Sequence, residues 1–264
     1  MNGRIAVPNI PLRTRDNLLI IVSLGGTVGL AWGYLFYLAQ HMTATDMPAM
    51  AMSAVPAMRM WNTTDFVLMF LMWSVMMVGM MVPTAMRALL IYGSIASRAN
   101  AQGTSVASTI WFASGYVTMW TMFSLLATFM QYALERWGLL SPMMVSASVT
   151  LGATLLVVAG VYQLTPWKDV CLKHCQSPAI YLATRFKPGI TGAVGLGARH
   201  GAYCLGCCWA IMVLLFLGGV MNLLWIAAIT AFVLAEKLLP AQFQIARVSG
   251  VAMIIGGVAF LTFA

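Results

Sequence analysis

All five cysteines of this 264-residue chain lie between residues 171 and 208, in two groups. The groups, each with a histidine, are Cys171, His174 and Cys175, then His200, Cys204, Cys207 and Cys208. On a helix, positions three or four apart share a face, so each group can converge. Thiolates and imidazoles bind soft and borderline metal ions. The spacing therefore predicts a metal site built from both groups.

Neighbouring charges support this interpretation, because Lys168, Lys173 and Arg199 favour the thiolate form that binds metal. Two alternatives remain open. Cys207 and Cys208 can simply pack as small apolar side chains. Cys204 and Cys207 also form a Cys-x-x-Cys pair, although no thioredoxin-like unit surrounds it, so a thiol redox role ranks third.

Methionine forms the second pattern, since 13 of the 22 methionines lie between His41 and Met86. In a predicted outer loop at residues 40–65, methionines alternate with Pro48, Pro56 and small residues without a helical period. Thioether sulfur suits Cu(I) and needs no deprotonation. The candidate ligands of this loop are His41, Met42, Met47, Met50 and Met52. Flexible apolar packing at a membrane interface is the alternative.

A further row of methionines, from Met69 to Met81, recurs at helical spacing. Such a row packs against other helices more often than it binds metal. Met76 and Met80 are the candidate ligands here, because they would lie deepest and close to Pro83, which removes a backbone donor from the helix.

The composition decides which elements position these groups. Hydrophobic residues make up 61% of the chain and charged residues only 8%, which excludes a soluble domain. The net charge of +8 lies in short stretches between apolar runs, so nucleic-acid binding is excluded as well. We expect a single all-α domain over residues 1–264, a polytopic bundle of membrane helices.

Seven apolar runs are long enough to cross a bilayer. They are Leu18–Ala39, Phe66–Ala85, Ala107–Tyr132, Met143–Leu164, Ala202–Val220, Leu223–Leu239 and Val248–Phe263. Met221 and Asn222 alone separate the fifth run from the sixth, which indicates a short hairpin closed by the asparagine.

Lysine and arginine predict the orientation. With the N-terminus in the cytoplasm, twelve of them fall on the inner side and only Arg59 and Arg136 on the outer side. The C-terminus is then outside, and residues 165–201 form a cytoplasmic connection that holds the first cysteine group and His200. Reducing conditions there keep thiols free, which favours metal binding over a disulfide. The predicted location is the bacterial cytoplasmic (inner) membrane.

Three separated blocks of the chain carry a resemblance to a known family. The blocks are Met72–Ala85 with Pro83, then Tyr162–Lys168 with Cys171, His174 and Cys175, and finally Gly201–Met212 with Cys204, Cys207 and Cys208. Together they resemble a bacterial family of predicted metal-binding integral membrane proteins, catalogued as domain of unknown function 2182. The resemblance runs from about Phe66 to the C-terminus. It implies a multi-span membrane protein with a proposed metal site and no known reaction.

These patterns favour copper handling, meaning capture, delivery or transport of the metal, with zinc or another soft ion as the alternative cofactor. Five thiols would hold the ion too firmly for a fast channel, which favours delivery, sensing or assembly. A second hypothesis is a non-catalytic subunit or assembly factor of a larger membrane metalloenzyme. Expected partners are membrane lipid, other membrane subunits or a copper chaperone. No catalytic residues are expected, and an independent enzyme is not predicted.

Two smaller expectations concern helix ends and helix packing. Glu236 and Lys237 are expected to form an ion pair or to anchor a helix end. Small residues that let helices approach closely are expected at Gly25, Gly26, Gly29, Gly250, Gly256 and Gly257.

Overall fold

The computed structural model describes residues 14–50, 61–140, 146, 148–239 and 244–263, without the side chains of residues 14–17 and 41–50. This part of the chain is all-α, as predicted, with one isolated bridge between Leu140 and Ser146. The helices are α1 (Thr14–Met50), α2 (Thr63–Ala101), α3 (Thr109–Arg136), α4 (Val149–Gln163), α5 (Pro166–Gln176), α6 (Pro178–Thr184), α7 (Gly189–Val213), α8 (Leu215–Gly218), α9 (Leu223–Leu238) and α10 (Ile245–Phe263).

Polar side chains define where several helices begin. At α2, Asn62 accepts from the Asp65 backbone N–H while the Asp65 carboxylate accepts from the Asn62 N–H, a complete capping box. At α9, the Asn222 side chain accepts from the Trp225 N–H. The predicted turn that ends in an asparagine between α8 and α9 is therefore confirmed.

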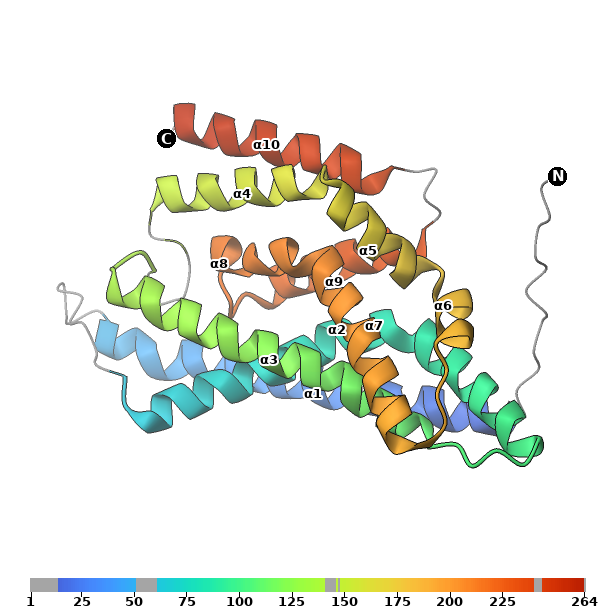
Figure 1. Cartoon of the computed structure of the whole chain (residues 1–264). Helices are drawn as coiled ribbons and strands as arrows, with labels where there is room; N and C mark the ends of the chain where they lie inside the picture. The colour runs from blue at the N-terminus through green and yellow to red at the C-terminus, as the bar shows by residue number, and fades with distance from the viewer. Residues whose placement is uncertain (1–13, 51–60, 141–145, 147, 240–243, 264) are drawn as a thin grey trace.

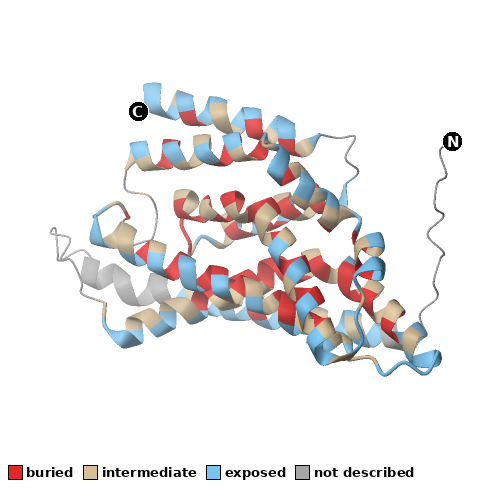
Figure 2. Ribbon diagram, viewed as in Figure 1, coloured by how far each residue is buried: buried red, intermediate tan, exposed pale blue. Residues whose placement is uncertain are grey.

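The helices form three groups (Figure 1). α4 and α10 pack along each other at one edge of the bundle, and α1, α2 and α3 form the opposite side. α7 lies between them and packs along α3. Buried positions concentrate where α2, α3 and α7 meet, and the outward faces of α1 and α10 are largely exposed (Figure 2).

Glycine allows the closest helix contacts. A Cβ atom at Gly197 of α7 would overlap the backbone of Phe112 in α3. On the other pair, a Cβ at Gly250 of α10 would lie 2.8 Å from the Gln163 side chain and 3.0 Å from the Gly160 carbonyl. Backbones approach this closely only where side chains are absent.

The expected small-residue contacts are confirmed in part. Gly250 and Gly257 of α10 pack tightly against α4. A Cβ added at any of the other four glycines, Gly25, Gly26, Gly29 or Gly256, would meet nothing within 4 Å, so their close packing against a helix of a partner subunit stays a prediction. These four lie on exposed stretches of α1 and α10, where no neighbouring helix covers them.

Five helical segments are long and apolar enough to cross a membrane: Leu18–Gln40, Thr63–Ala101, Thr109–Arg136, Gly189–Gly218 and Ile245–Phe263. The pair α4 and α5, bent by 68° at a short break, gives a sixth if it is one broken span. Seven crossings were expected. The 16 residues of α9 extend about 24 Å, less than the roughly 30 Å of a bilayer core, so the seventh crossing stays a prediction.

The helices that contain the fifth and sixth predicted runs can be compared with the expected first residues of those runs. α9 begins at Leu223 as expected, whereas α7 begins at Gly189, well before the expected Ala202. His200 therefore lies inside a long helix, and its ring is buried.

The contact between α3 and α7 can be tested with two glycines of the same helix. Gly197→Ala forces the helices apart, and we expect it to destabilise the protein by about 1–3 kcal/mol. Gly195→Ala is the matched control, because a Cβ there meets nothing within 4 Å and alanine favours a helix by about 1 kcal/mol. Thermal unfolding of both variants in detergent checks the prediction, which equal midpoints would contradict.

Candidate metal centre

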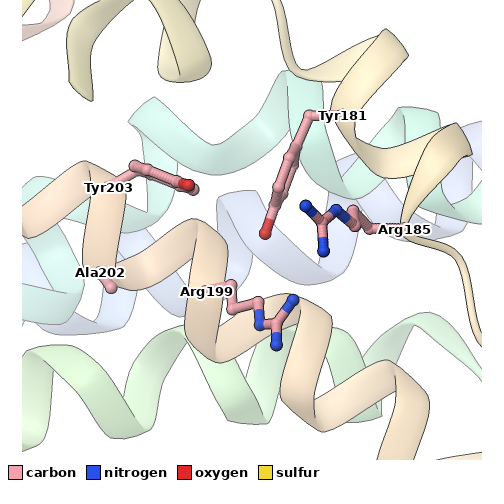
Figure 3. A pocket seen from close by; sticks show the side chains of 5 residues that line it. All are labelled: Tyr181, Arg185, Arg199, Ala202 and Tyr203. Atoms are coloured by element: carbon pink, nitrogen blue, oxygen red, sulfur yellow. The ribbon is translucent and has the colours of Figure 1, made fainter. Parts of the chain in front are cut away.

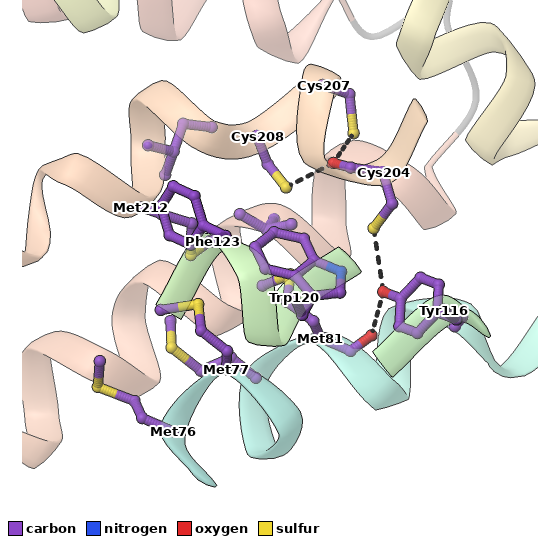
Figure 4. Close-up of a cluster of buried hydrophobic side chains, with 14 of the residues drawn as sticks. Met76, Met77, Met81, Tyr116, Trp120, Phe123, Cys204, Cys207, Cys208 and Met212 are labelled. Atoms are coloured by element: carbon purple, nitrogen blue, oxygen red, sulfur yellow. Dashed lines mark hydrogen bonds between the residues drawn. The ribbon is translucent and has the colours of Figure 1, made fainter. Parts of the chain in front are cut away.

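Helix α7 carries three cysteines whose side chains are buried among the helices. Cys204, Cys207 and Cys208, here called the α7 thiols, each expose 1% of their surface. The thiols of Cys207 and Cys208 both donate to the Cys204 carbonyl, at 3.1 and 2.9 Å (Figure 4). All five cysteines are free. The sulfurs are therefore held on one helix face, unoxidised and out of contact with solvent.

Helix α5 brings a fourth buried thiol to this face. The Cys175 Sγ lies 3.8 Å from the Cys207 Sγ. Metal–sulfur bonds of about 2.3 Å at the tetrahedral angle hold two sulfurs about 3.8 Å apart, so this spacing suits two ligands of one ion. The two predicted cysteine groups thus meet at these two residues.

The second thiol of α5 explains how the two helices come so close. The Cys171 Sγ would lie 2.8 Å from a Cβ atom added at Gly206 of α7. Tyr162, at the end of α4, donates its hydroxyl hydrogen to the Gly206 carbonyl. A glycine at position 206 therefore lets α5 dock on α7 and carry Cys175 to Cys207.

A lysine that was expected to serve a helix end lies among these sulfurs. Lys237 of α9 is 3% exposed, and its Nζ lies 2.8 Å from the Cys204 Sγ, 3.2 Å from the Thr84 Oγ1 and 3.8 Å from the Cys208 Sγ. The chain has only six acidic residues against fourteen basic ones, so thiols are an available source of negative charge. That imbalance is the signal in the sequence that could have indicated this contact.

Helices α2 and α3 complete the surroundings of Cys204. The Tyr116 hydroxyl donates to the Met81 carbonyl at 2.8 Å and lies 3.0 Å from the Cys204 Sγ (Figure 4). Thr84 also donates to the Met81 carbonyl, at 2.8 Å, and its oxygen is 3.8 Å from the same sulfur. Cys204 is therefore surrounded by a cation and two hydroxyl groups from three other helices.

Glu236, the neighbour of Lys237, forms a separate buried ion pair. Its carboxylate contacts the Lys168 Nζ at 2.8 and 2.9 Å and accepts from the Gln163 side-chain amide at 2.9 Å. Glu236 is 3% exposed and Lys168 is fully buried. The expected ion pair is confirmed for Glu236, with Lys168 of α5 as the partner. This pair fixes α5 to α9 beside the α7 thiols.

The two histidines lie in aromatic surroundings. The His174 ring stacks on Tyr203 at 4.2 Å between centroids, and its Nδ1 lies 2.8 Å from the Val170 carbonyl oxygen. The ring of His200 lies near those of Phe112 and Tyr116, and its buried Nδ1 has no hydrogen-bond partner within the described residues.

Among the described residues, no three His, Cys, Asp or Glu side chains form a group that could hold a metal ion. The complete set of seven cysteine and histidine ligands therefore stays a prediction. Of these seven side chains, the structure brings the sulfurs of Cys175 and Cys207 from the two groups into contact.

The predicted methionine ligands fall into two groups. Met76 and Met80 lie in the hydrophobic core, 1% and 0% exposed, where their packing matches the alternative interpretation of the methionine row. Helix α1 continues to Met50, so the first part of the predicted loop is helical. His41, Met42, Met47 and Met50 belong to that helix, but their side chains lie outside the description, as does all of Met52.

The ion pair of Glu236 gives a test of how α5 is held. Glu236→Gln leaves the Lys168 ammonium buried without its counter-charge, and we expect a loss of about 3–5 kcal/mol in unfolding free energy. The double variant Lys168→Met/Glu236→Gln removes both charges and should recover most of that loss. Denaturant unfolding in detergent measures both, and a fully stable single variant would contradict the prediction.

Comparison with known proteins identifies the family to which the chain belongs. Residues 70–260 match a family model described as PpoB2, copper chaperone. No curated protein and no solved structure shows significant similarity to the chain. The match covers most of the chain, including α3 to α9 and all five cysteines. The chain therefore belongs to this copper chaperone family.

Proposed function

We propose that this protein is a multi-pass protein of the bacterial cytoplasmic membrane that holds Cu(I) on buried thiols and delivers it to a partner protein. The observation that carries the proposal is the contact between Cys175 and Cys207, 3.8 Å apart, beside Cys204 with its lysine. Soft thiolate ligands select Cu(I), the ion that the family name implies.

Exposed apolar side chains support the membrane location. Leu30 of α1, Leu224 of α9 and Phe263 of α10 expose 78%, 82% and 91% of their surface. Large apolar side chains over so much of the surface would favour aggregation in water, whereas lipid chains solvate them. Together with five helical segments of sufficient length, they favour a protein embedded in a bilayer.

The lysine gives the site a balanced charge. One Cu(I) bound by two thiolates carries a net charge of −1, and such a charge is costly in apolar surroundings unless a partner neutralises it. The ammonium group of Lys237, 2.8 Å from the Cys204 Sγ, supplies one positive charge. If Cys204 supplies one of the two thiolates and the other thiols stay protonated, the copper site is neutral overall without any carboxylate.

Methionines would bind Cu(I) more weakly than the thiols do, before the ion reaches the α7 thiols. Thioethers are neutral, so Met76 and Met80 bind Cu(I) without charge compensation and compete weakly with thiolates. In this scheme the methionines and His41 of residues 40–65 collect copper outside, and the α7 thiols receive it. Strong terminal ligands suit delivery to a partner rather than rapid flow through a channel.

Delivery also unites the two leading interpretations of the sequence. A copper chaperone supplies metal to a protein that needs it, which is the task of an assembly factor for a membrane metalloenzyme. The partner is then a membrane subunit or a further copper-binding protein that approaches from the cytoplasmic side.

Copper content of the purified protein tests the thiol site directly. We expect Cys204→Ser and Cys207→Ser to lose near-stoichiometric copper in elemental analysis, because serine does not replace a soft sulfur ligand. Met122→Leu is the control, since this methionine is 61% exposed on α3. Full copper retention in both cysteine variants would show that these thiols do not bind the metal. Preferential retention of zinc by the wild type would show that the site binds zinc rather than copper. Partners that copurify from the same membranes identify the recipient.

Substitutions of Lys237 that remove or keep its positive charge test whether this charge stabilises bound Cu(I). Lys237→Met should weaken Cu(I) binding at least tenfold, about the loss expected for one charged contact, whereas Lys237→Arg should retain most of the affinity. Competition with a coloured Cu(I) chelator measures both constants. If the methionine variant binds as tightly as the wild type, the charge-balance argument is wrong.

A further inference from the structure

A cavity of about 260 Å³ opens between α6 and α7, and no cysteine is among the residues that line it. It is lined by Tyr181, Arg185, Arg199, Ala202 and Tyr203. Figure 3 shows the two guanidinium groups and the Tyr181 hydroxyl facing the same space. Two cations and a phenol therefore converge on one small volume.

The polar groups of this cavity lack counter-charges within the protein. In the described part of the chain, neither Arg185 nor Arg199 forms an ion pair with a carboxylate. The Tyr181 oxygen is buried and has no hydrogen-bond partner among these residues. A buried hydroxyl without a partner costs free energy, so its orientation into the cavity points to a ligand that accepts hydrogen bonds.

An aromatic frame fixes the phenol in place. The Tyr181 ring packs edge-on against Tyr203 and against His174, with centroids 5.5 and 5.6 Å apart. The phenol of a tyrosine is protonated at neutral pH. It can therefore donate a hydrogen bond at neutral pH but cannot act as an anion for the arginines.

We propose that this cavity binds a phosphate group, with Arg185 and Arg199 as the charged donors and the Tyr181 hydroxyl as the third donor. Guanidinium groups present pairs of N–H donors whose geometry fits the oxygens of a phosphate. Three donors from different directions suit a tetrahedral oxyanion better than a planar carboxylate. The cavity is also larger than a single oxyanion, which leaves room for the group that carries it.

The position of Arg199 is consistent with two sources of phosphate. It lies ten residues after the start of α7, or about 15 Å along the helix, on the side that the lysine and arginine distribution assigns to the cytoplasm. Basic pockets at this level bind the head groups of anionic lipids. Free phosphate from the cytoplasm has the same chemistry and could reach the same cavity. The proposal is independent of the copper function, because none of its three donors contacts a thiol.

The test uses the full chain in detergent and native mass spectrometry with added phosphatidylglycerol. Arg185→Gln/Arg199→Gln should weaken retention of the bound lipid at least tenfold, and Tyr181→Phe, which removes one donor, should weaken it several-fold. Arg87→Gln/Arg98→Gln is the matched control, since it also removes two positive charges, from exposed positions of α2. The double variant should keep its copper, and Tyr181→Phe keeps the test valid if the double variant is unstable.

A second titration with inorganic phosphate distinguishes the sources. Saturable phosphate binding that depends on the same three residues, without selective lipid retention, would assign the cavity to free phosphate. Lipid retention that depends on them would assign it to a head group. If neither ligand distinguishes the Arg185/Arg199 and Tyr181 variants from Arg87→Gln/Arg98→Gln, the proposal is overturned.

Discussion

A charged side chain inside an apolar helix bundle must meet an opposite charge, because neither lipid nor a hydrocarbon core can solvate it. Two lysines of this protein meet that requirement in different ways. Lys168 contacts the carboxylate of Glu236, and Lys237, one residue further along α9, contacts the sulfur of Cys204. In the second contact a cysteine takes the place of a carboxylate, and its thiolate form would both neutralise the lysine and bind a soft metal ion.

These contacts also determine how the helices assemble. The surroundings of Cys204 join α7 to α9 through Lys237, to α3 through Tyr116 and to α2 through Thr84. The ion pair of Lys168 joins α5 to α9, and Gly206 lets α5 approach α7. The arrangement of sulfurs is therefore a product of the whole packing, and a substitution in any of these helices changes the geometry around Cys204.

Local patterns predicted more of this protein than long-range contacts did. Helical spacing correctly put Cys204, Cys207 and Cys208 on one face, and composition correctly indicated long apolar helices. α7 begins before the apolar run that starts at Ala202, and its first part, from Gly189 to Gly201, is rich in glycine, which disfavours a helix unless packing compensates. Close contact with α3 provides that packing, and no local pattern reveals it. The contact of Lys237 with Cys204 was missed for the same reason, since 33 positions separate the two residues.

The proline of α2 has a consequence for how the amino-terminal helix is attached. Pro83 has no N–H group, so the carbonyl of Gly79, four residues earlier, loses its normal helical donor. The indole of Trp32 in α1 lies in its place, with its nitrogen 3.4 Å from that oxygen, and Gly79 leaves room for the approach. This contact therefore attaches α1 to the turn of α2 that precedes Pro83. Loss of the Trp32 indole would leave this carbonyl without a donor and would remove one attachment of the exposed amino-terminal helix next to Met80 of the methionine row.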